Sequence, residues 1–578
     1  HRMGSGIINT AVTGLNVAQY GLLTTEHNIA NVNTPGFSRQ RSIQESNAGL
    51  LTGAGFVGQG AHVATVERMY SRFLTEQVDR SQSSASELET YYAQISQIDD
   101  LLADSGTGLS PALQAFFASV QDLAANPSQL PNRQAMVSAA QSLSARYQSL
   151  SDQLAEMYDG INSGITAAVA SVNSYGEQIA SLNGRIAVAE ASTGQPPNDL
   201  LDTRDQMVLE LNQLIRTRTT TNTDGSYNVF VGSGQQLVVG SQLVGMATMA
   251  SSADSSRLVV GLRTTAGVQE MPESLISGGS LSGLLAFRSE SLDRASNDLG
   301  SNAASLALTF NAQHALGQDF FGQSQLASSP PTSFTPQFFS VSPPVVIGNT
   351  RNPPGSPLVS AAFVSPPPFN GNFYADLGNS DYRLNADGAG LTLTRLTDNK
   401  QWSGADLAAV NAQLSSDPQG FELASPGALV AGSSYLIQPT RGAARGIAVN
   451  PALIADSRLI AAAGPLRAAA GTANTGTATI SSGQAGPGYA DAVAGWLPIS
   501  LEYNAGELRN FPVGAWVSID GEAPVEITPS DPGIAYTSGA TVTLVGSASV
   551  SPPTGFSFVM TGLPNNGDRF TVEINSGA

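Results

Sequence analysis

Histidine, the side chain most often used for metal binding and for proton transfer near neutral pH, is scarce in this sequence. His27, His62 and His314 lie in three separate segments, with no grouping of carboxylates at the spacing of metal ligands and no cysteine anywhere in the chain. We therefore predict no metal site. His314 falls on a predicted helix stripe, where a histidine with satisfied ring nitrogens is more common than a catalytic base.

Other patterns that support catalysis are also missing. The sequence has no G-x-S-x-G turn, and its one lysine, Lys400, follows Leu-Thr-Asp-Asn, which excludes a phosphate-binding loop. Asn385–Gly388 is similar to part of a calcium loop, but Arg383 stands where the first carboxylate is needed, so we predict a turn. We predict no enzymatic activity and no cofactor. One alternative stays open, because the two carboxylates of a glycoside hydrolase have no fixed sequence spacing.

Size and charge limit the class of protein. A chain of 578 residues exceeds what one hydrophobic core serves, so we expect three or four domains. The formal net charge is −19, from 26 basic and 45 acidic side chains, which argues against nucleic acid and against an anionic membrane surface as partners. No apolar run approaches the ~18–20 residues of a membrane span.

The first thirty residues have the spacing of a helix that buries one narrow stripe. Residues 7–33 place apolar or small side chains at alternating steps of three and four, namely Ile8, Ala11, Leu15, Ala18, Leu22, Thr25 and Ile29. The stripe is weak, and an isolated helix of this length is marginal in water, so we expect it to be ordered only against partner helices. We predict Ile8, Ala11, Leu15, Ala18, Leu22 and Ile29 as an assembly interface. Thr34-Pro35-Gly36 is predicted to form the turn that ends the helix.

This segment resembles the N-terminal signature of the bacterial flagellar axial proteins, which comprise rod, hook and hook-associated proteins. In that family a G-L-N-x-A-Q-x-G-L helix runs into N-I-A-N-x-x-T-P-G-[FY], and this chain carries both halves at Gly14–Leu22 and Asn28–Phe37. Asn198–Gln206 (NDLLDTRDQ) and Phe310–Asp319 (FNAQHALGQD) also resemble segments of the hook-associated members. On this basis residues 4–37 are predicted as an axial helix with its turn.

The next part of the chain is predicted to be helical. Residues 38–85, polar and then glycine-rich, are expected to form an extended connector. Residues 86–317 are predicted as an elongated helical domain with a β-hairpin insertion at 217–278. Its longest pattern runs over residues 132–192, about 60 residues or ~90 Å, and a phase slip between Gly160 and Gly164 predicts a bend or local unwinding.

The remaining sequence is predicted to be β-rich. Prolines that forbid helix recur there: Pro330, Pro331, Pro336, Pro343, Pro344, Pro353, Pro354 and Pro366–Pro368. Two stretches, Gly420–Ile437 and Gly555–Val572, repeat glycine, aromatic and aliphatic residues at identical offsets. We predict two related modules, at 318–455 and 456–578. The fold class is therefore α+β and multidomain, an elongated helical bundle followed by β-rich modules.

The resemblance implies a structural role. It implies a subunit that assembles with its own copies as a short section of a tube, joining hook to filament, next to hook protein and an adjacent hook-associated protein. It also implies export through the flagellar type III apparatus with a chaperone, and an extracellular location. A cleaved secretory signal is not predicted, because Ile7–Leu23 contains Asn9, Asn16 and Gln19.

The sequence departs from the family at its end. Family members carry a C-terminal segment that returns through the helical domain and pairs with the first helix, and the chaperone binds in that segment. This sequence ends at Ala578, after a predicted strand. We therefore expect the first helix to be mobile or to pack on neighbouring copies, and this chain alone to assemble poorly.

Three other classes stay open at this level. One is another axial protein, such as a hook or distal rod protein, because the N-terminal signature is shared. The second is an adhesin or phage-tail-like fibre, whose β modules would bind carbohydrate. The third is a secreted hydrolase.

Overall fold

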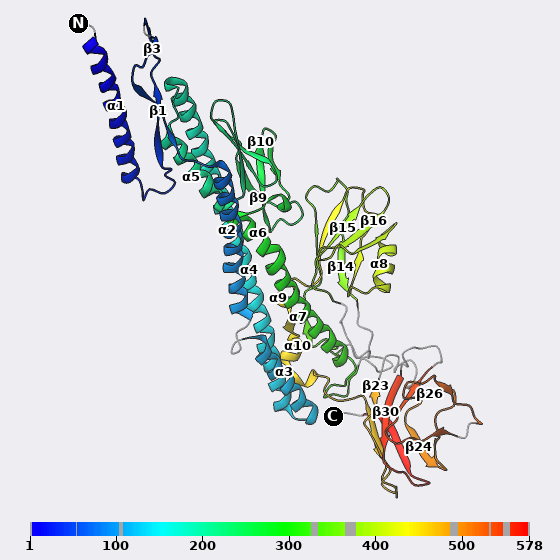
Figure 1. Cartoon of the computed structure of the whole chain (residues 1–578). Helices are drawn as coiled ribbons and strands as arrows, with labels where there is room; N and C mark the ends of the chain where they lie inside the picture. Colours follow the sequence, from blue (N-terminus) through cyan, green and yellow to red (C-terminus); the bar gives the residue numbers. More distant parts are fainter. Residues whose placement is uncertain are drawn as a thin grey trace. The chain divides into compact units, whose positions relative to one another are not determined.

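The structure is a computed structural model that describes residues 3–53, 55–102, 108–324, 333–364, 377–485, 495–530, 533–546 and 555–575. The chain divides into two compact units (Figure 1). One contains the chain up to Asp99 together with Glu156–Asp293, and the other contains Asp100–Ala155 together with Arg294 onward. Of the prolines predicted to exclude helix, Pro330, Pro331 and Pro366–Pro368 lie outside the described residues.

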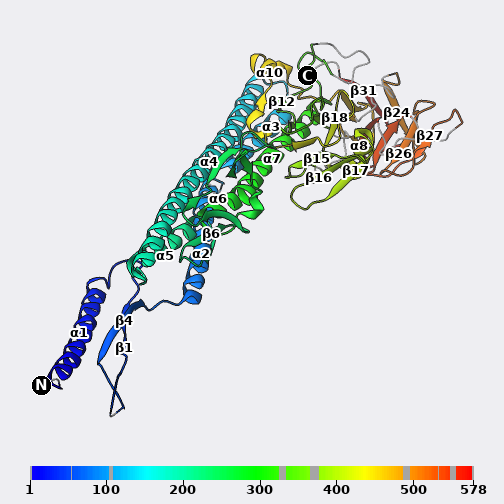
Figure 2. The ribbon, with the colours of Figure 1, turned by 90° about the horizontal axis from the view of Figure 1, so that it is seen from above.

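The chain begins with a helix and a two-stranded ribbon, which together form what we term the arm (residues 3–68). Its elements are α1 (Met3–Ala30), β1 (Gln40–Ser46), β2 (Leu50–Thr52), β3 (Gly55–Val57) and β4 (Ala61–Arg68). Strand β1 pairs antiparallel with β4, from Gln40 opposite Arg68 to Ser46 opposite Ala61. Strands β2 and β3 form the hairpin at the tip, and α1 lies beside the β1–β4 ribbon (Figure 2).

The end of α1 differs from the prediction by three residues. The helix ends at Ala30 rather than at residue 33, because the Asn31 side chain donates to the carbonyl of His27 at 3.0 Å. The predicted turn follows. The Phe37 N–H donates to the Thr34 carbonyl at 3.2 Å, and Gly36 has φ +77°, as a type II turn with proline in second place requires.

The helices of the first unit include one, α2 (Arg72–Leu102), that begins earlier than the periodicity suggested. They are α2, α4 (Leu130–Thr193), α5 (Asn198–Leu214), α6 (Gly279–Phe287), the π-helical turn η2 (Arg288–Leu292) and α7 (Asp293–His314), of which α2, α4 and α7 continue into the second unit. The predicted extended connector at 38–85 is wrong from Arg72 onward. No glycine or proline interrupts residues 61–105, and Arg72 pairs with Glu76 one turn away, so a helix is favoured.

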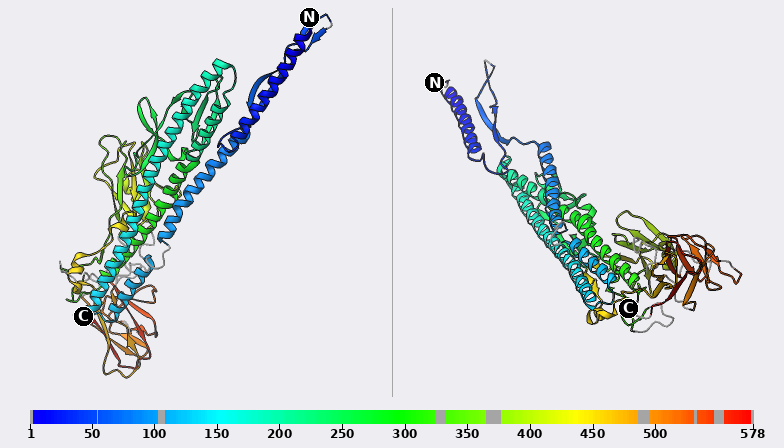
Figure 3. Two further views of the ribbon diagram at one scale, coloured as in Figure 1. Left: turned by 90° about the vertical axis from the view of Figure 1, so that its left-hand side faces the viewer. Right: turned by 90° about the horizontal axis from the view of Figure 1, so that it is seen from below.

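The long helix predicted at 132–192 is confirmed as α4 (Figure 3). The local unwinding expected near Gly160–Gly164 is not found, because the backbone stays α-helical throughout. Gly164 has a packing role. A side chain there would place its Cβ 3.1 Å from Leu284 of α6, so glycine lets the two helices approach closely.

The predicted insertion forms two small sheets. Their strands are β5 (Thr217–Thr221), β6 (Tyr227–Val231), β7 (Gln235–Val239), β8 (Gln242–Leu243), β9 (Met246–Ala250), β10 (Leu258–Thr264) and β11 (Gly267–Glu270), followed by the short turn η1 (Glu273–Leu275). Asparagines of α4 bind the backbone of these strands. Asn183 donates to the Tyr227 and Gly240 carbonyls and accepts from the Tyr227 N–H, and Asn173 bonds both backbone groups of Met246.

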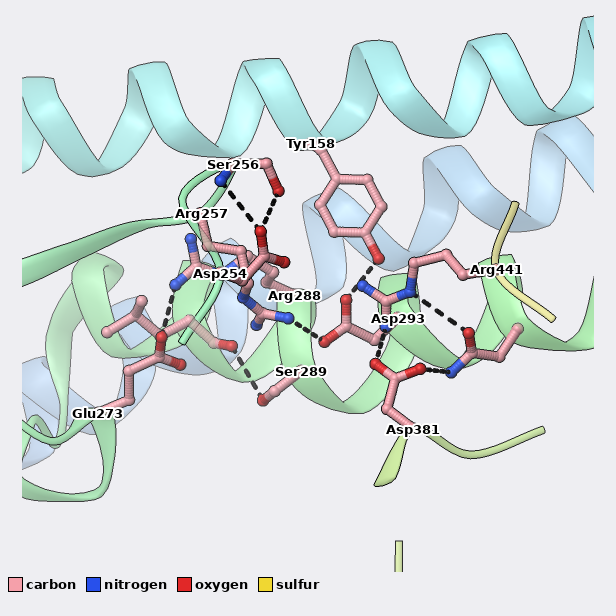
Figure 4. A network of polar contacts seen from close by, with 12 residues as sticks. Tyr158, Asp254, Ser256, Arg257, Glu273, Arg288, Ser289, Asp293, Asp381 and Arg441 are labelled. Atoms are coloured by element: carbon pink, nitrogen blue, oxygen red, sulfur yellow. Dashed lines mark hydrogen bonds and ion pairs between the residues drawn. The ribbon is translucent and has the colours of Figure 1, made fainter. Parts of the chain in front are cut away.

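Ion pairs also fasten the insertion to the helices (Figure 4). Arg257, just before β10, bonds Asp293 at 2.6 Å, and Tyr158 of α4 donates to the same carboxylate. Fully buried Arg288 bonds Glu273 of η1 at 2.7 Å. The insertion is therefore held by paired charges as well as by apolar packing.

The second unit carries an aromatic cluster among its helices. Phe116 of α3 (Leu109–Ala125), Phe310 of α7, Phe338 and Phe339 have ring centroids 4.8–6.3 Å apart. His314 lies beside this cluster. Its Nδ1 bonds the Pro336 carbonyl and its Nε2 accepts from the Ala461 N–H, both at 2.9 Å. Both ring nitrogens are thus satisfied, as predicted for a packing residue, and burial lowers the pKa of His314 to about 4.

Two β modules follow, each with its own core. The first contains β12 (Phe339–Ser340), β13 (Val345–Gly348), β14 (Ser360–Phe363), β15 (Tyr382–Ala386), β16 (Leu391–Arg395), β17 (Gln401–Gly404), α8 (Leu407–Ser416), β18 (Phe421–Ala424), β19 (Ser434–Gln438), α9 (Ala443–Gly446), β20 (Ala448–Val449), α10 (Pro451–Ala455) and η3 (Ser457–Leu459). The second contains β21 (Leu466–Ala470), β22 (Thr479–Ile480), β23 (Gln484–Ala485), β24 (Ile499–Asn504), β25 (Glu507–Arg509), β26 (Trp516–Ile519), β27 (Val525–Glu526), β28 (Ile534–Ala535), β29 (Thr541–Val545), β30 (Gly555–Thr561) and β31 (Arg569–Ile574).

The two modules share one strand order and one register. The order β13-β19-β15-β16 in the first corresponds to β21-β31-β24-β25 in the second. Leu384 opposite Tyr435 corresponds to Leu501 opposite Phe570. The two strands of each predicted repeat, β18 and β19 or β30 and β31, belong to different sheets rather than to one hairpin. The predicted relationship between the modules is supported by topology, whereas their boundaries stay predictions.

A first prediction concerns Asn183. Its fully buried amide bonds the Tyr227 and Gly240 carbonyls and the Tyr227 N–H. We expect Asn183→Ala to cost about 2–4 kcal/mol locally, because several buried polar groups lose their partner. Hydrogen exchange of the β6 and β7 amides should accelerate accordingly. Gln178→Ala, at an exposed site on the same helix, is the control, and equal exchange in both variants would contradict the assignment.

A second prediction concerns Asp79 of α2. Burial, with Asp205 and Glu76 nearby, raises its pKa to about 6, although Arg80, Arg216 and Arg218 line the same pocket. A carboxyl with a raised pKa destabilises the fold as pH rises through that value.

Asp79→Asn should therefore stabilise the protein by about 1 kcal/mol at pH 7.5, after allowance for partial exposure, and leave it unchanged near pH 4. Urea unfolding at the two pH values measures this. Asp99→Asn, exposed on the same helix, is the control. A gain that is equal at both pH values would contradict the proposed cause.

Candidate assembly interface

The predicted stripe of α1 lies at the surface of the chain. The exposed fractions of its large side chains are 63% for Ile8, 69% for Leu15, 72% for Leu22 and 69% for Ile29. Ala11 and Ala18 are exposed as well. The described part of the chain thus leaves this stripe, which we term the seam of α1, uncovered. The role of the seam as an interface remains a prediction.

The opposite face of α1 contacts the arm's own ribbon. Val17 is 6% exposed and lines a groove with Thr13 and Tyr20 of α1 and with residues of β4. The Asn28 side chain donates to the Gln40 carbonyl and accepts from the Gln40 N–H, both at 2.8 Å. We expected α1 to be ordered only against partner helices, whereas the face with Val17 and Asn28 packs against the chain's own ribbon. The Asn28 side chain bonds the N–H and the carbonyl of Gln40 as the backbone of a neighbouring strand would. These two bonds fix the rotation of α1 about its own axis.

The predicted turn brings the end of α1 to the start of α5. The Phe37 ring meets the His27 ring edge-on, with centroids 5.4 Å apart. The Gln40 side chain donates to Asp199 Oδ1 at 3.0 Å, and His27 Nε2 lies 3.4 Å from the same oxygen. Thr34, Pro35 and Gly36 thus act by position, since they direct the chain from the helix into β1.

Charged side chains gather where the ribbon meets α5. Arg68, at the end of β4, lies 2.9 Å from Asp202 Oδ1 and 2.6 Å from Asp205 Oδ2. The other oxygen of Asp202 accepts from the Ser38 N–H at 2.9 Å. Burial alone would lower the pKa of Arg68, but Asp205 and Asp202 raise it above its ordinary value. Burial raises the pKa of Asp205, against the effect of Arg68.

Sequence reasoning missed a second exposed seam, on α2. Its exposed side chains repeat at steps of four and three, namely Leu74, Val78, Ser81, Ala85, Leu88 and Tyr92. The side facing the unit is polar instead. Ser83 is fully buried, Glu87 accepts from Ser282 at 2.7 Å, and Tyr91 bonds Ser291 at 2.6 Å. The signal was present in the spacing from Leu74 onward, but it was hidden by assigning residues 38–85 to a connector.

The described ranges bear on the sequence-based expectation about metal sites. They contain no group of three histidine, cysteine, aspartate or glutamate side chains able to hold a metal ion. His62 is exposed on β4, far in sequence from other histidines, and Asp387 accepts from Ala389 and Gly390 in the predicted turn. No helix in the part that the structure describes is both long and apolar enough to cross a membrane.

Comparison with known families gives two matches. Residues 95–327 match the family model described as the flagellar hook-associated protein FlgK helical domain. Residues 465–574 match that of the flagellar hook-associated protein 1 D3 domain. The second match begins one residue before β21, in agreement with the start of the second module in the structure.

Relatives and a solved structure agree with these matches. The flagellar hook-associated protein 1 of Salmonella typhimurium is 35% identical over 441 residues, 76% of each chain. That of Escherichia coli is 34% identical over 461 residues, 79% of this chain and 80% of the relative. The flagellar hook junction protein FlgK from Burkholderia pseudomallei aligns with a TM-score of 0.72 at 33% identity, over 87% of this chain and 88% of that one. The resemblance inferred from the N-terminal signature is confirmed, and the chain belongs to the flagellar hook-associated protein 1 family.

Proposed function

We propose that this chain is a structural subunit of the junction between the hook and the filament of a bacterial flagellum. The observation that carries the proposal is the seam of α1, which is exposed, regular and directly followed by the family's turn, in a chain whose relatives are hook-associated proteins. A surface of this kind is unstable in water unless other helices cover it.

Assembly follows from the two seams. Burying one leucine or isoleucine side chain contributes roughly 1.5–3 kcal/mol, so the large residues of one α1 offset only part of the entropy lost on association. Many copies together make the assembly stable. The small residues Ala11 and Ala18 let partner helices approach closely, and the α2 seam offers a second surface of the same spacing.

The finer partners are also proposals. Own copies, hook protein and an adjacent hook-associated protein would supply the helices that cover the seams, in an extracellular assembly. Export would use the flagellar type III apparatus and a chaperone that binds a C-terminal segment. This route fits a chain that contains no cysteine and therefore cannot form incorrect disulfides outside the cell. The role needs no catalysis.

Deletion and add-back in the parent cell tests the function. Cells without the protein should build hooks that carry no filaments, and the wild-type gene should restore them. Hooks that still carry filaments after deletion would overturn the proposal. Binding to a glycan array would instead favour an adhesin.

The seam has its own prediction. Leu15→Asp or Leu22→Asp should abolish incorporation, because a buried carboxylate in the seam has no partner. Leu23→Asp is the matched control, since Leu23 is also exposed but lies outside the seam. Filament counts per cell measure the effect. Melting curves should show residues 86–575 still folded in each variant, and global unfolding would count against the interpretation.

A further inference from the structure

Three carboxylates of α5 contact three different parts of the arm. Asp199, Asp202 and Asp205 are spaced by three residues, so they lie along one side of the helix. Asp199 bonds the Gln40 side chain of β1 and lies near His27 of α1. Asp202 accepts from the Ser38 backbone and from Arg68, and Asp205 pairs with Arg68. One face of α5 therefore touches the end of α1, the start of β1 and the end of β4.

Arg68 is the centre of this contact. Its side chain is 10% exposed, against 7% for Asp202 and 13% for Asp205, and its guanidinium stacks over the Tyr70 ring at 4.2 Å. One cation thus serves two largely buried carboxylates. Removing it would break the ion pairs of both carboxylates and leave only Arg204 as a nearby cation for Asp205, which is far more costly than losing a surface pair.

Amide contacts accompany the ion pairs. Asn198, the first residue of α5, donates to the Val66 carbonyl at 2.7 Å, and Gln195 donates to the Ala64 carbonyl at 3.2 Å. These contacts hold the free edge of β4. A two-stranded ribbon is only marginally stable alone, so its direction depends on such external contacts.

We propose that Arg68, Asp202 and Asp205 form a joint that fixes the direction of the arm on α5. Resting on the proposed function, we further infer that incorporation into the junction requires this joint. In a regular assembly every copy must present its α1 seam in the same direction. The 28 residues of α1 span about 42 Å, so a tilt of about 10° at the joint displaces the far end by about 7 Å, enough to lose helix packing.

Distance measurement by spin labelling tests the joint. The chain has no cysteine, so Gln19→Cys on α1 and Glu177→Cys on α4, both exposed, give one defined label pair. With Arg68 intact we expect a narrow distance distribution. Arg68→Met, which keeps the aliphatic stem and removes the charge, should at least double its width.

Matched controls separate the joint from general damage. Arg41→Met removes an exposed ion pair with Glu67 on the same ribbon and should leave the width unchanged. A reference pair at Glu177→Cys and Thr264→Cys lies outside the arm and should stay narrow in every variant. If Arg68→Met broadens the reference pair, Asp202→Asn replaces it, because that variant retains the Arg68–Asp205 pair; it should broaden the arm distance alone.

Each outcome decides a part of the proposal. A broad distribution in the unaltered arm, or an unchanged width in Arg68→Met or in its substitute, overturns the joint. In the parent cell, Arg68→Met should lower the fraction of hooks with filaments at least tenfold, whereas Arg41→Met should not. A loosened arm with normal filaments overturns the requirement for the joint, and leaves the junction function to be judged by deletion and by Leu22→Asp.

Discussion

The structure depends on how α1 divides its surface. One face of the helix contacts the chain's own ribbon. There the Asn28 side-chain amide forms hydrogen bonds with both the N–H and the carbonyl of Gln40. Because one face is bound in a single orientation, the other face, with Leu15 and Leu22, has to point away from the ribbon. The described part of the chain therefore leaves the apolar seam uncovered, so a helix that packed on this seam would gain the free energy of burying it.

The contacts that position these elements suit a weakly charged chain. Charged residues make up 12% of the sequence. Neutral side-chain amides form many of the contacts between elements, as those of Asn173, Asn183 and Asn198 do with backbone carbonyls. Hydrogen bonds between neutral groups are not screened by salt, and the ion pairs of Arg68 and Arg288 are largely buried, where screening is weak.

Sequence periodicity predicted the helices and the turn, but it did not predict the contacts between elements far apart in the sequence. The seam of α1, the turn at Pro35 and the long helix α4 follow from local spacing, which a sequence records directly. The start of α2 at Arg72 was missed because residues 38–85 were assigned to one connector, although the helical spacing of apolar residues already begins at Leu74. The contact of Arg68 with Asp202 joins residues more than a hundred positions apart, and spacing carries no information about such pairs.

The two β modules share the way in which the chain enters and leaves them. In the shared sheet of each module the first strand in sequence pairs with the last, β13 with β19 and β21 with β31, so Val345 lies opposite Gln438, and Leu466 lies opposite Ile574. The chain consequently enters and leaves each module at neighbouring points. Equivalent turns accompany the shared register. Gly432 and Gly567 have φ of +89° and +92°, and their N–H groups donate at 2.8 Å to Ala386 of β15 and to Tyr503 of β24, the strands that pair with β19 and β31. What differs between the modules lies in the middle of each, where the first has α8 and the second has β26–β29. A module whose ends coincide can change its interior and its outer surface while the helices that carry the seams keep their sequence and their packing.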